Sequence, residues 1–126
     1  MGHPPNRPIS ETEIEAIIQG HESRNAALRQ TLVDKGVDLG EPRIIECHFW
    51  SWSQANSASL ADDLVSRGFE ILAQRSARSS REPELWNVEA AIKQSVELTL
   101  RREFTDELVR IAATHFGKYD GWGTRL

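Results

Sequence analysis

Three neighbouring residues, Glu46, Cys47 and His48, are of types that catalytic and metal sites use. A thiol beside an imidazole suggests nucleophilic catalysis, and a carboxylate with an imidazole suggests acid–base chemistry or metal binding. They lie in "RIIECHFWSW", residues 43–52, a segment rich in β-branched and aromatic residues that predicts a strand. Because side chains alternate between the two faces of a strand, Glu46 and His48 share one face and Cys47 lies on the other. No local Cys–His pair is therefore expected, and Glu46 with His48 needs a third residue from elsewhere to make a site.

The common catalytic and nucleotide-binding motifs are missing from the sequence, which has no G-x-x-x-x-G-K, no H-E-x-x-H and no G-x-S-x-G. We therefore predict a protein that is not an enzyme, with no catalytic residues, no cofactor and no metal. A small enzyme or ligand-binding domain that uses the Glu46/His48 face is the alternative. Cys47 is the only cysteine, which excludes an intrachain disulfide and fits a reducing compartment.

The strand face of Glu46 and His48 also carries Trp50 and, at the end of the segment, Trp52. The residues that alternate with this row are apolar, which suggests that they face the other side of the strand and lie under helices: Ile45, Cys47 and Phe49. We therefore expect the row Glu46, His48, Trp50 and Trp52 to face outward and to bind a partner protein. A dimer contact and cover by the N-terminal helix are the alternatives.

The surrounding pattern predicts the elements that position this strand. Ser10 and Glu13 form a capping box that starts a helix of about residues 11–35, in which Gly20 and a polar middle predict a kink or break near residues 20–25. Periodicity and glycine stops predict the rest. These are helices of about residues 54–67 and 100–116, and strands of about residues 69–76, 85–95 and from 118 onward. The order βαββαβ after an N-terminal helix indicates an α+β, ferredoxin-like sandwich, with a four-stranded antiparallel sheet and two helices on one face.

The length of 126 residues fits one domain. We expect residues 1–9 to form a flexible arm, residues 10–36 the N-terminal helix and residues 41–126 the ferredoxin-like domain. With 15 basic and 19 acidic residues the net charge is −4, which disfavours general binding to nucleic acid. No apolar run is long enough for a signal peptide or a membrane span, so we expect a cytoplasmic protein without a membrane partner.

A short aromatic and glycine-rich motif follows the last predicted helix: Tyr119, Asp120, Gly121, Trp122 and Gly123. The Asp-Gly pair favours a turn or bulge with a positive φ at the glycine. A tryptophan in a terminal strand is expected to anchor that strand in the core. We therefore interpret the motif mainly as a structural lock, with direct contact to a partner as the alternative.

Three stretches together resemble a known family. "KYDGWGT" after a helix ending in "HFG", with "IECHF" at residues 45–49 and "GFEI" at residues 68–71, resembles the regulators of ribonuclease E activity of type B, the RraB family, over about residues 22–124. The resemblance implies a ferredoxin-like fold and a bacterial, non-catalytic regulator of RNA decay. It also implies a protein partner, a ribonuclease E-type endonuclease whose activity the regulator lowers.

Three arginines, Arg75, Arg78 and Arg81, punctuate the segment between two predicted strands. Some RNA-binding ferredoxin-like domains carry arginines in a hairpin loop beside an aromatic sheet. The aromatic RNP pattern of such domains is missing here. An RNA-contacting module is therefore our third hypothesis.

Overall fold

A computed structural model describes residues 8–76 and 85–125 and shows a four-stranded antiparallel sheet in the order β2-β3-β1-β4. The strands are β1 (Pro42–Ser51), β2 (Glu70–Ser76), β3 (Trp86–Ser95) and β4 (Lys118–Thr124). The helices are α1 (Glu11–Asp34), α2 (Gln54–Ser66), α3 (Val96–Thr99) and α4 (Arg102–Thr114). The predicted α+β class, with an N-terminal helix before βαββαβ, is confirmed.

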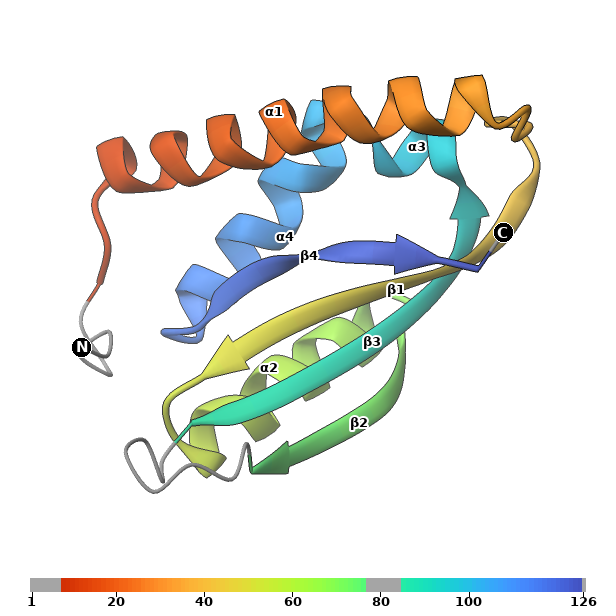
Figure 1. Ribbon diagram of the computed structural model, residues 1–126. Coiled ribbons are helices and arrows are strands. Elements are labelled where there is room, and N and C mark those ends of the chain that lie inside the picture. Colours follow the sequence, from red (N-terminus) through yellow and green to blue (C-terminus); the bar gives the residue numbers. More distant parts are fainter. Residues whose placement is uncertain (1–7, 77–84, 126) are drawn as a thin grey trace.

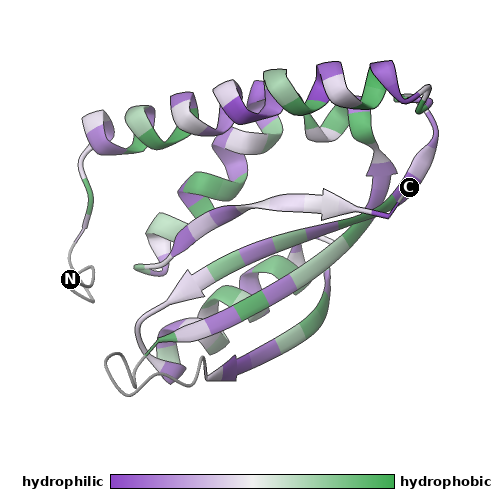
Figure 2. Cartoon of the chain, viewed as in Figure 1, coloured by the Kyte–Doolittle hydropathy of each residue, from purple (hydrophilic) through white to green (hydrophobic). Residues whose placement is uncertain are grey.

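The sheet has one covered and one open face. Figure 1 shows α2 and α4 behind the sheet, while α1 runs along the side of β4 and α4. We call the face under α2 and α4 the inner face and the opposite one the outer face. The hydrophobic core fills the space between the inner face and the helices, and its largest fully buried side chain is Phe49. Hydrophobic and hydrophilic residues alternate along β1 and β3 (Figure 2), as expected for strands buried on one side only.

Helix α1 is one continuous element. Its start is the predicted capping box, in which the Ser10 hydroxyl accepts from the Glu13 N–H and the Ser10 N–H donates to the Glu13 carboxylate. The predicted interruption near residues 20–25 is wrong, since α1 runs unbroken through Gly20. A glycine costs a helix only about 1 kcal/mol, and the burial of side chains on both sides of Gly20, from Ile14 to Leu32, outweighs that cost.

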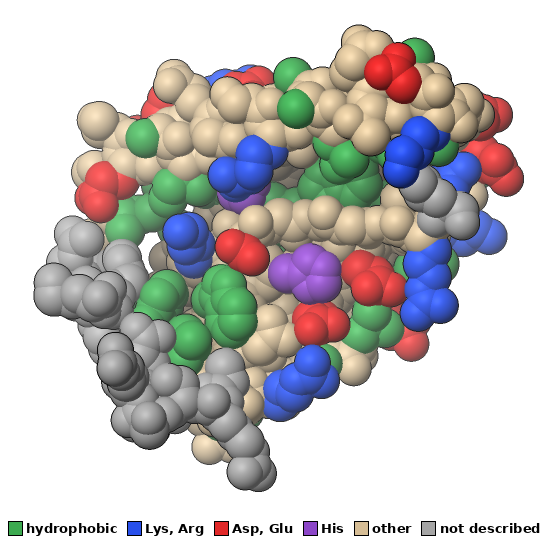
Figure 3. All heavy atoms as spheres, viewed as in Figure 1, with side chains coloured by type: hydrophobic (Ala, Val, Ile, Leu, Met, Phe, Trp, Pro, Cys, Tyr) green, Lys and Arg blue, Asp and Glu red, His purple; other side chains and the backbone are tan. Residues whose placement is uncertain are grey.

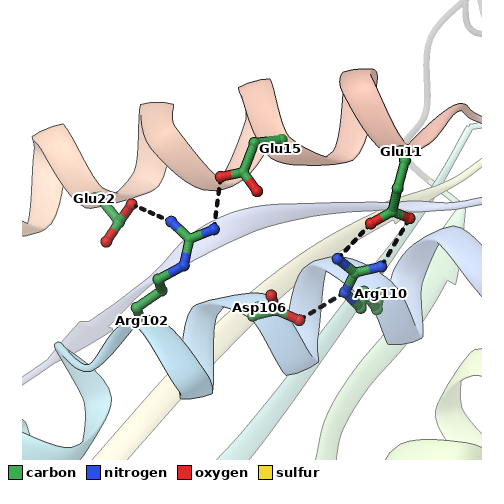
Figure 4. A network of polar contacts seen from close by, with 6 residues as sticks. All are labelled: Glu11, Glu15, Glu22, Arg102, Asp106 and Arg110. Atoms are coloured by element: carbon green, nitrogen blue, oxygen red, sulfur yellow. Dashed lines mark hydrogen bonds and ion pairs between the residues drawn. The ribbon is translucent and has the colours of Figure 1, made fainter.

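Ion pairs hold α1 against α4 (Figure 4). Arg102 bridges Glu15 at 2.6 Å and Glu22 at 2.7 Å, and Arg110 pairs with Glu11 at 2.6 Å. Hydrogen bonds to these carboxylates raise the pKa of both arginines, and the bond from Arg110 lowers the pKa of Glu11. Each arginine reaches across from α4 to α1, so the pairs fix the position of α1 along α4.

The turn between α4 and β4 brings the last strand onto β1. Phe116 has a positive φ of 58°, and the Gly117 N–H closes the helix by donating to the Ala112 carbonyl at 2.7 Å. A Cβ at Gly117 would lie 2.7 Å from the Trp50 carbonyl oxygen, so only glycine fits at this close approach. The turn formed by His115, Phe116 and Gly117 therefore places β4 next to β1.

The remaining predictions differ in detail from the structure. The short helix α3, capped by the Ser95 hydroxyl, was not predicted, and α4 begins and ends two residues inside the predicted 100–116 helix. The expected arm lies outside the described residues except for its last two, and Arg78 and Arg81 lie outside them as well. None of the described helices has the length and apolar character needed to cross a membrane.

Candidate functional site

Strand β1 presents two chemically different sides. Cys47 and Phe49 are completely buried on the inner face, whereas Glu46, His48 and Trp50 are partly exposed on the outer face. Trp52 lies just beyond β1, before α2, and is also partly exposed. In the described part of the chain α1 lies along the β4 side, and no helix lies over this row.

The neighbours of this row come from the two strands that pair with β1. His48 lies opposite Glu89 of β3 and Gly121 of β4, and Glu89 forms an ion pair with Arg75 of β2 at 3.4 Å. Cross-strand partners share a face, so these residues also belong to the outer face. Figure 3 shows this face, with acidic and basic side chains interspersed around a histidine.

The aromatic residues of the β4 motif point the other way, into the fold. Tyr119 is 2% exposed and its ring lies 5.2 Å from that of Phe49. Trp122 lies opposite Cys47 and is partly buried against the core. The Trp122 Nε1–H donates to Asn25 Oδ1 at 3.0 Å, and Asn25 Nδ2–H in turn donates to Thr105 Oγ1 of α4 at 3.4 Å. One indole thus links β4 to α1 and, through Asn25, to α4.

His21 of α1 closes the free edge of β4. The Arg24 guanidinium, which can only donate, lies 2.9 Å from His21 Nδ1, so this nitrogen accepts. The proton is therefore on Nε2, which donates to the Tyr119 carbonyl at 3.1 Å. Burial, and then the charge of Arg24, lower the pKa of His21, so the ring is neutral at neutral pH. A β4 backbone group that faces away from the sheet is thereby satisfied within the chain.

The glycines of the same motif lie on the outer face. The pairing of β4 with β1 shifts register between His48 and Phe49, and Asp120 is the extra residue of this bulge. After the bulge, Gly121 lies opposite His48 and Gly123 opposite Glu46. Apart from its neighbours in sequence, no described residue would have a heavy atom within 4 Å of a Cβ at either glycine. We call Gly121 and Gly123 the glycine strip, because here the outer face consists of bare backbone.

A hollow of about 300 Å³ adjoins the glycine strip between α1, β4 and β1. It is lined by His21, Arg24, Asn25, Leu28, His48, Asp120, Gly121 and Trp122. Arg24 and Asp120 are exposed, so both charges are accessible at this hollow. A second hollow, lined by residues of β3, α3 and α4, includes Leu98 and Phe104 and lies away from the row.

The buried groups give little support to nucleophilic chemistry. Burial raises the pKa of Cys47 to about 12, which disfavours the thiolate form that a nucleophilic cysteine needs at neutral pH. Within residues 8–76 and 85–125, no three His, Cys, Asp or Glu side chains are grouped to hold a metal ion. Glu46 and His48 share the outer face, as predicted. The side chains that line the hollow with His48 include charged and hydrogen-bonding groups, which could contact a polar ligand.

Sequence reasoning missed the contribution of α1 to this region. Arg24 and Asn25 carry no motif, and their positions depend on how α1 docks against β4 and α4. His21 lies at helical spacing from Ile14 and Ile18, and a histidine at such a position is the one signal in the sequence of a buried polar contact. The glycine strip lies within the motif that the sequence had singled out.

Comparisons with known proteins agree with the resemblance. The sequence model of the family described as "Regulator of ribonuclease activity B" matches residues 22–124. A protein of that name from Shewanella amazonensis is 25% identical over 111 residues, which cover 88% of this chain and 79% of the relative. Another of the same name, from Shewanella denitrificans, is 24% identical over 102 residues, covering 81% and 79%. The matched range contains the whole sheet and the glycine strip.

Proposed function

The chain belongs to the family of regulators of ribonuclease activity B, and on that premise we propose that it binds a ribonuclease E-type endonuclease and lowers its activity without catalysing a reaction itself. The observation that carries the proposal is the outer face of the sheet. Its row of Glu46, His48 and Trp50 has no helix over it in the described part of the chain.

The composition of this face suits a protein partner. Tryptophan is enriched among the residues that contribute most to protein–protein affinity, and Trp50 offers a partly exposed ring amid polar neighbours. The opposite face is committed to α2 and α4, so the outer face is the large surface that the fold leaves available. We place the partner over Glu46, His48 and Trp50, with Trp52 at the end of the row.

The test uses the purified chain and the ribonuclease E-type endonuclease of the same organism. We expect direct binding by titration calorimetry and slower cleavage of an RNA substrate when the chain is added. Trp50→Ser should weaken binding at least about tenfold, as expected for an interface tryptophan, and should lower the melting temperature less than Phe49→Ala does, because Trp50 is partly exposed. Val65→Ser is the matched control, because Val65 is 54% exposed on α2, which covers the inner face.

Two outcomes would contradict the proposal. If wild-type chain neither binds the endonuclease nor slows cleavage, the regulatory role is wrong. If Trp50→Ser and Val65→Ser bind equally well, the partner does not use the outer face. Repeating the titration after removal of RNA distinguishes a protein contact from one that RNA bridges.

A further inference from the structure

We infer that the glycine strip and the adjoining hollow receive an extended segment of the protein partner, with its backbone over Gly123 and one acidic side chain held by Arg24 and His48. This inference rests on the proposed function, because it assumes a protein partner on the outer face. It assigns a role to the part of the β4 motif that does not hold the fold together.

Nothing in the described part of the chain requires a glycine at position 123. Its φ does not lie in the left-handed region, unlike that of Gly121 at 138°. A Cβ at Gly123 would meet nothing within 4 Å, so the described residues leave room for a side chain. A glycine inside a strand lowers stability relative to alanine, and it often marks a place where another backbone approaches closely. Bare backbone on an open face is therefore best explained by a molecule that lies against it.

Gly121 is fixed by the bulge, and the bulge shapes the hollow. The extra residue, Asp120, lets Tyr119 and Trp122 both face inward although they are three positions apart. With no side chain at Gly121, the hollow has open backbone beside His48. A partner segment that lies on Gly123 is thus two residues along β4 from Gly121 and the hollow.

The charges at the hollow select the chemistry of the occupant. In the described part of the chain Arg24 forms no ion pair, and its one hydrogen bond goes to the neutral His21. The Arg24 guanidinium therefore has free donors, and His48 lines the same hollow. A guanidinium binds a carboxylate through two parallel hydrogen bonds, so an Asp or Glu side chain is the ligand that fits Arg24.

A single carboxylate fits this surface better than a polyanion does. Asp120 lines the hollow, and Glu46 and Glu89 lie on the same face of the neighbouring strands. A nucleic acid strand crossing the face would bring successive phosphates against these carboxylates, whereas a single acidic side chain can contact Arg24 and His48 without a second anionic group beside it. The net charge of −4 acts in the same direction. We therefore commit to a protein segment as the occupant.

The first test needs no endonuclease. ¹⁵N-labelled chain is titrated with the capped peptide acetyl-Ala-Glu-Ala-amide, with acetyl-Ala-Gln-Ala-amide as its uncharged match and with a short oligouridylate. We expect saturable shifts of the Gly121, Gly123 and His48 amides with the Glu peptide, at a Kd on the order of 1 mM. The Gln peptide should bind about tenfold more weakly, because it cannot form the charge-assisted pair with Arg24.

Two results of this titration overturn the inference. If the Glu and Gln peptides shift these amides equally, or neither does so saturably, the hollow does not recognise a carboxylate. If the oligouridylate binds the same residues more tightly than the Glu peptide, the surface is an RNA contact. Arg24→Gln should abolish the preference for Glu, and Arg24→Lys should restore part of it.

The second test uses the endonuclease and separates the inference from the proposed function. Gly123→Ala should weaken binding about tenfold while the melting temperature stays equal or rises. Gly40→Ala is the matched control, because Gly40 is exposed in the α1–β1 loop, away from the strip, and a Cβ there makes only ordinary contact. If the endonuclease binds wild type, Gly123→Ala and Arg24→Gln alike, the inference is wrong and the proposed function stands. If peptide shifts appear but the endonuclease does not bind, the proposed function is wrong and the carboxylate site stands.

Discussion

The two faces of the β1–β4 pair are built from the same short segments and do opposite things. On the inner face, Phe49 and Tyr119 pack ring against ring, and Trp122 reaches Asn25 of α1. On the outer face, His48 lies beside Gly121, where β4 contributes no side chain at all. The inner face therefore belongs to the hydrophobic core, whereas the outer face remains partly exposed.

The difference shows that one sequence motif can serve both purposes without compromise. Strand alternation sends successive residues to opposite faces, and the bulge at Asp120 resets the alternation so that both aromatic residues of β4 reach the core. A motif of this kind divides into a structural half and an open half, and each half can be tested separately.

The largest expected contrast lies between adjacent residues of β1. Phe49→Ala should lower the free energy of unfolding by about 3–5 kcal/mol, because Phe49 is completely buried and its removal leaves a cavity. Trp50→Ser, one residue along, should lower it by less, because Trp50 is partly exposed whereas Phe49 is not. Urea unfolding of both variants measures the contrast. Similar losses for the two would mean that Trp50 belongs to the core and that the outer face is not available.

A smaller loss is expected from Trp122→Phe, which keeps a six-membered aromatic ring and removes the indole N–H together with the five-membered ring that carries it. Asn25 Oδ1 would then lose its donor at a partly buried position, which should cost about 1–2 kcal/mol. Combining Trp122→Phe with Asn25→Ala in a double-mutant cycle isolates the pair from the effect on packing. Strictly additive losses in the cycle would show that the indole does not tie β4 to α1.

The smallest effect concerns pH and His21. Its pKa is lowered from the ordinary 6.5 in the folded state, chiefly by burial and next by the charge of Arg24, while the hydrogen bond to the Tyr119 carbonyl and then the charge of Asp120 oppose the shift. Above pH 6.5 the ring is neutral in both states and its contribution to stability is fully present. As the pH falls below 6.5 the unfolded chain takes up a proton first, so stability declines until the pH has passed the folded pKa.

This decline can be separated from that of the carboxylates. The pKa values of Glu11 and Asp63 lie below their ordinary 4.5 and 3.8, so their contributions are lost at lower pH. Thermal unfolding between pH 7 and pH 5 should therefore show a slope that His21→Gln removes and that His48→Gln, on the outer face, retains. An unchanged slope in His21→Gln would place the titrating group elsewhere.

Local patterns in the sequence were sufficient to predict most of the fold. The capping box at Ser10, the alternation around Cys47 and the glycine stop at Gly117 each act within a few residues, so their structural outcome can be read directly. The same alternation predicted that Glu46, His48 and Trp50 would face away from the helices. Tertiary contacts overrode local propensity at Gly20, where packing along α1 keeps the helix continuous.

The long-range part of the site could not be predicted in this way. The contact between Trp122 and Asn25 joins residues 97 positions apart, and nothing in either local pattern specifies the other. The placement of Gly121 and Gly123 on the outer face depends on a register shift of one residue in the β1–β4 pairing. Without that shift the same sequence would place its glycines and its tryptophan differently.

The contacts that hold α1 also govern when the chain can finish folding. His21 binds Tyr119 98 positions later, and Glu11 binds Arg110 99 positions later. Closing such long loops is slow, and during synthesis α1 leaves the ribosome well before its partners exist. The apolar side chains of α1 that are buried in the fold, such as Ile14 and Ile18, must therefore remain exposed to water or be shielded by a chaperone until β4 has been made. Of all the helices in this fold, the first to be synthesised is the one that waits for the last strand.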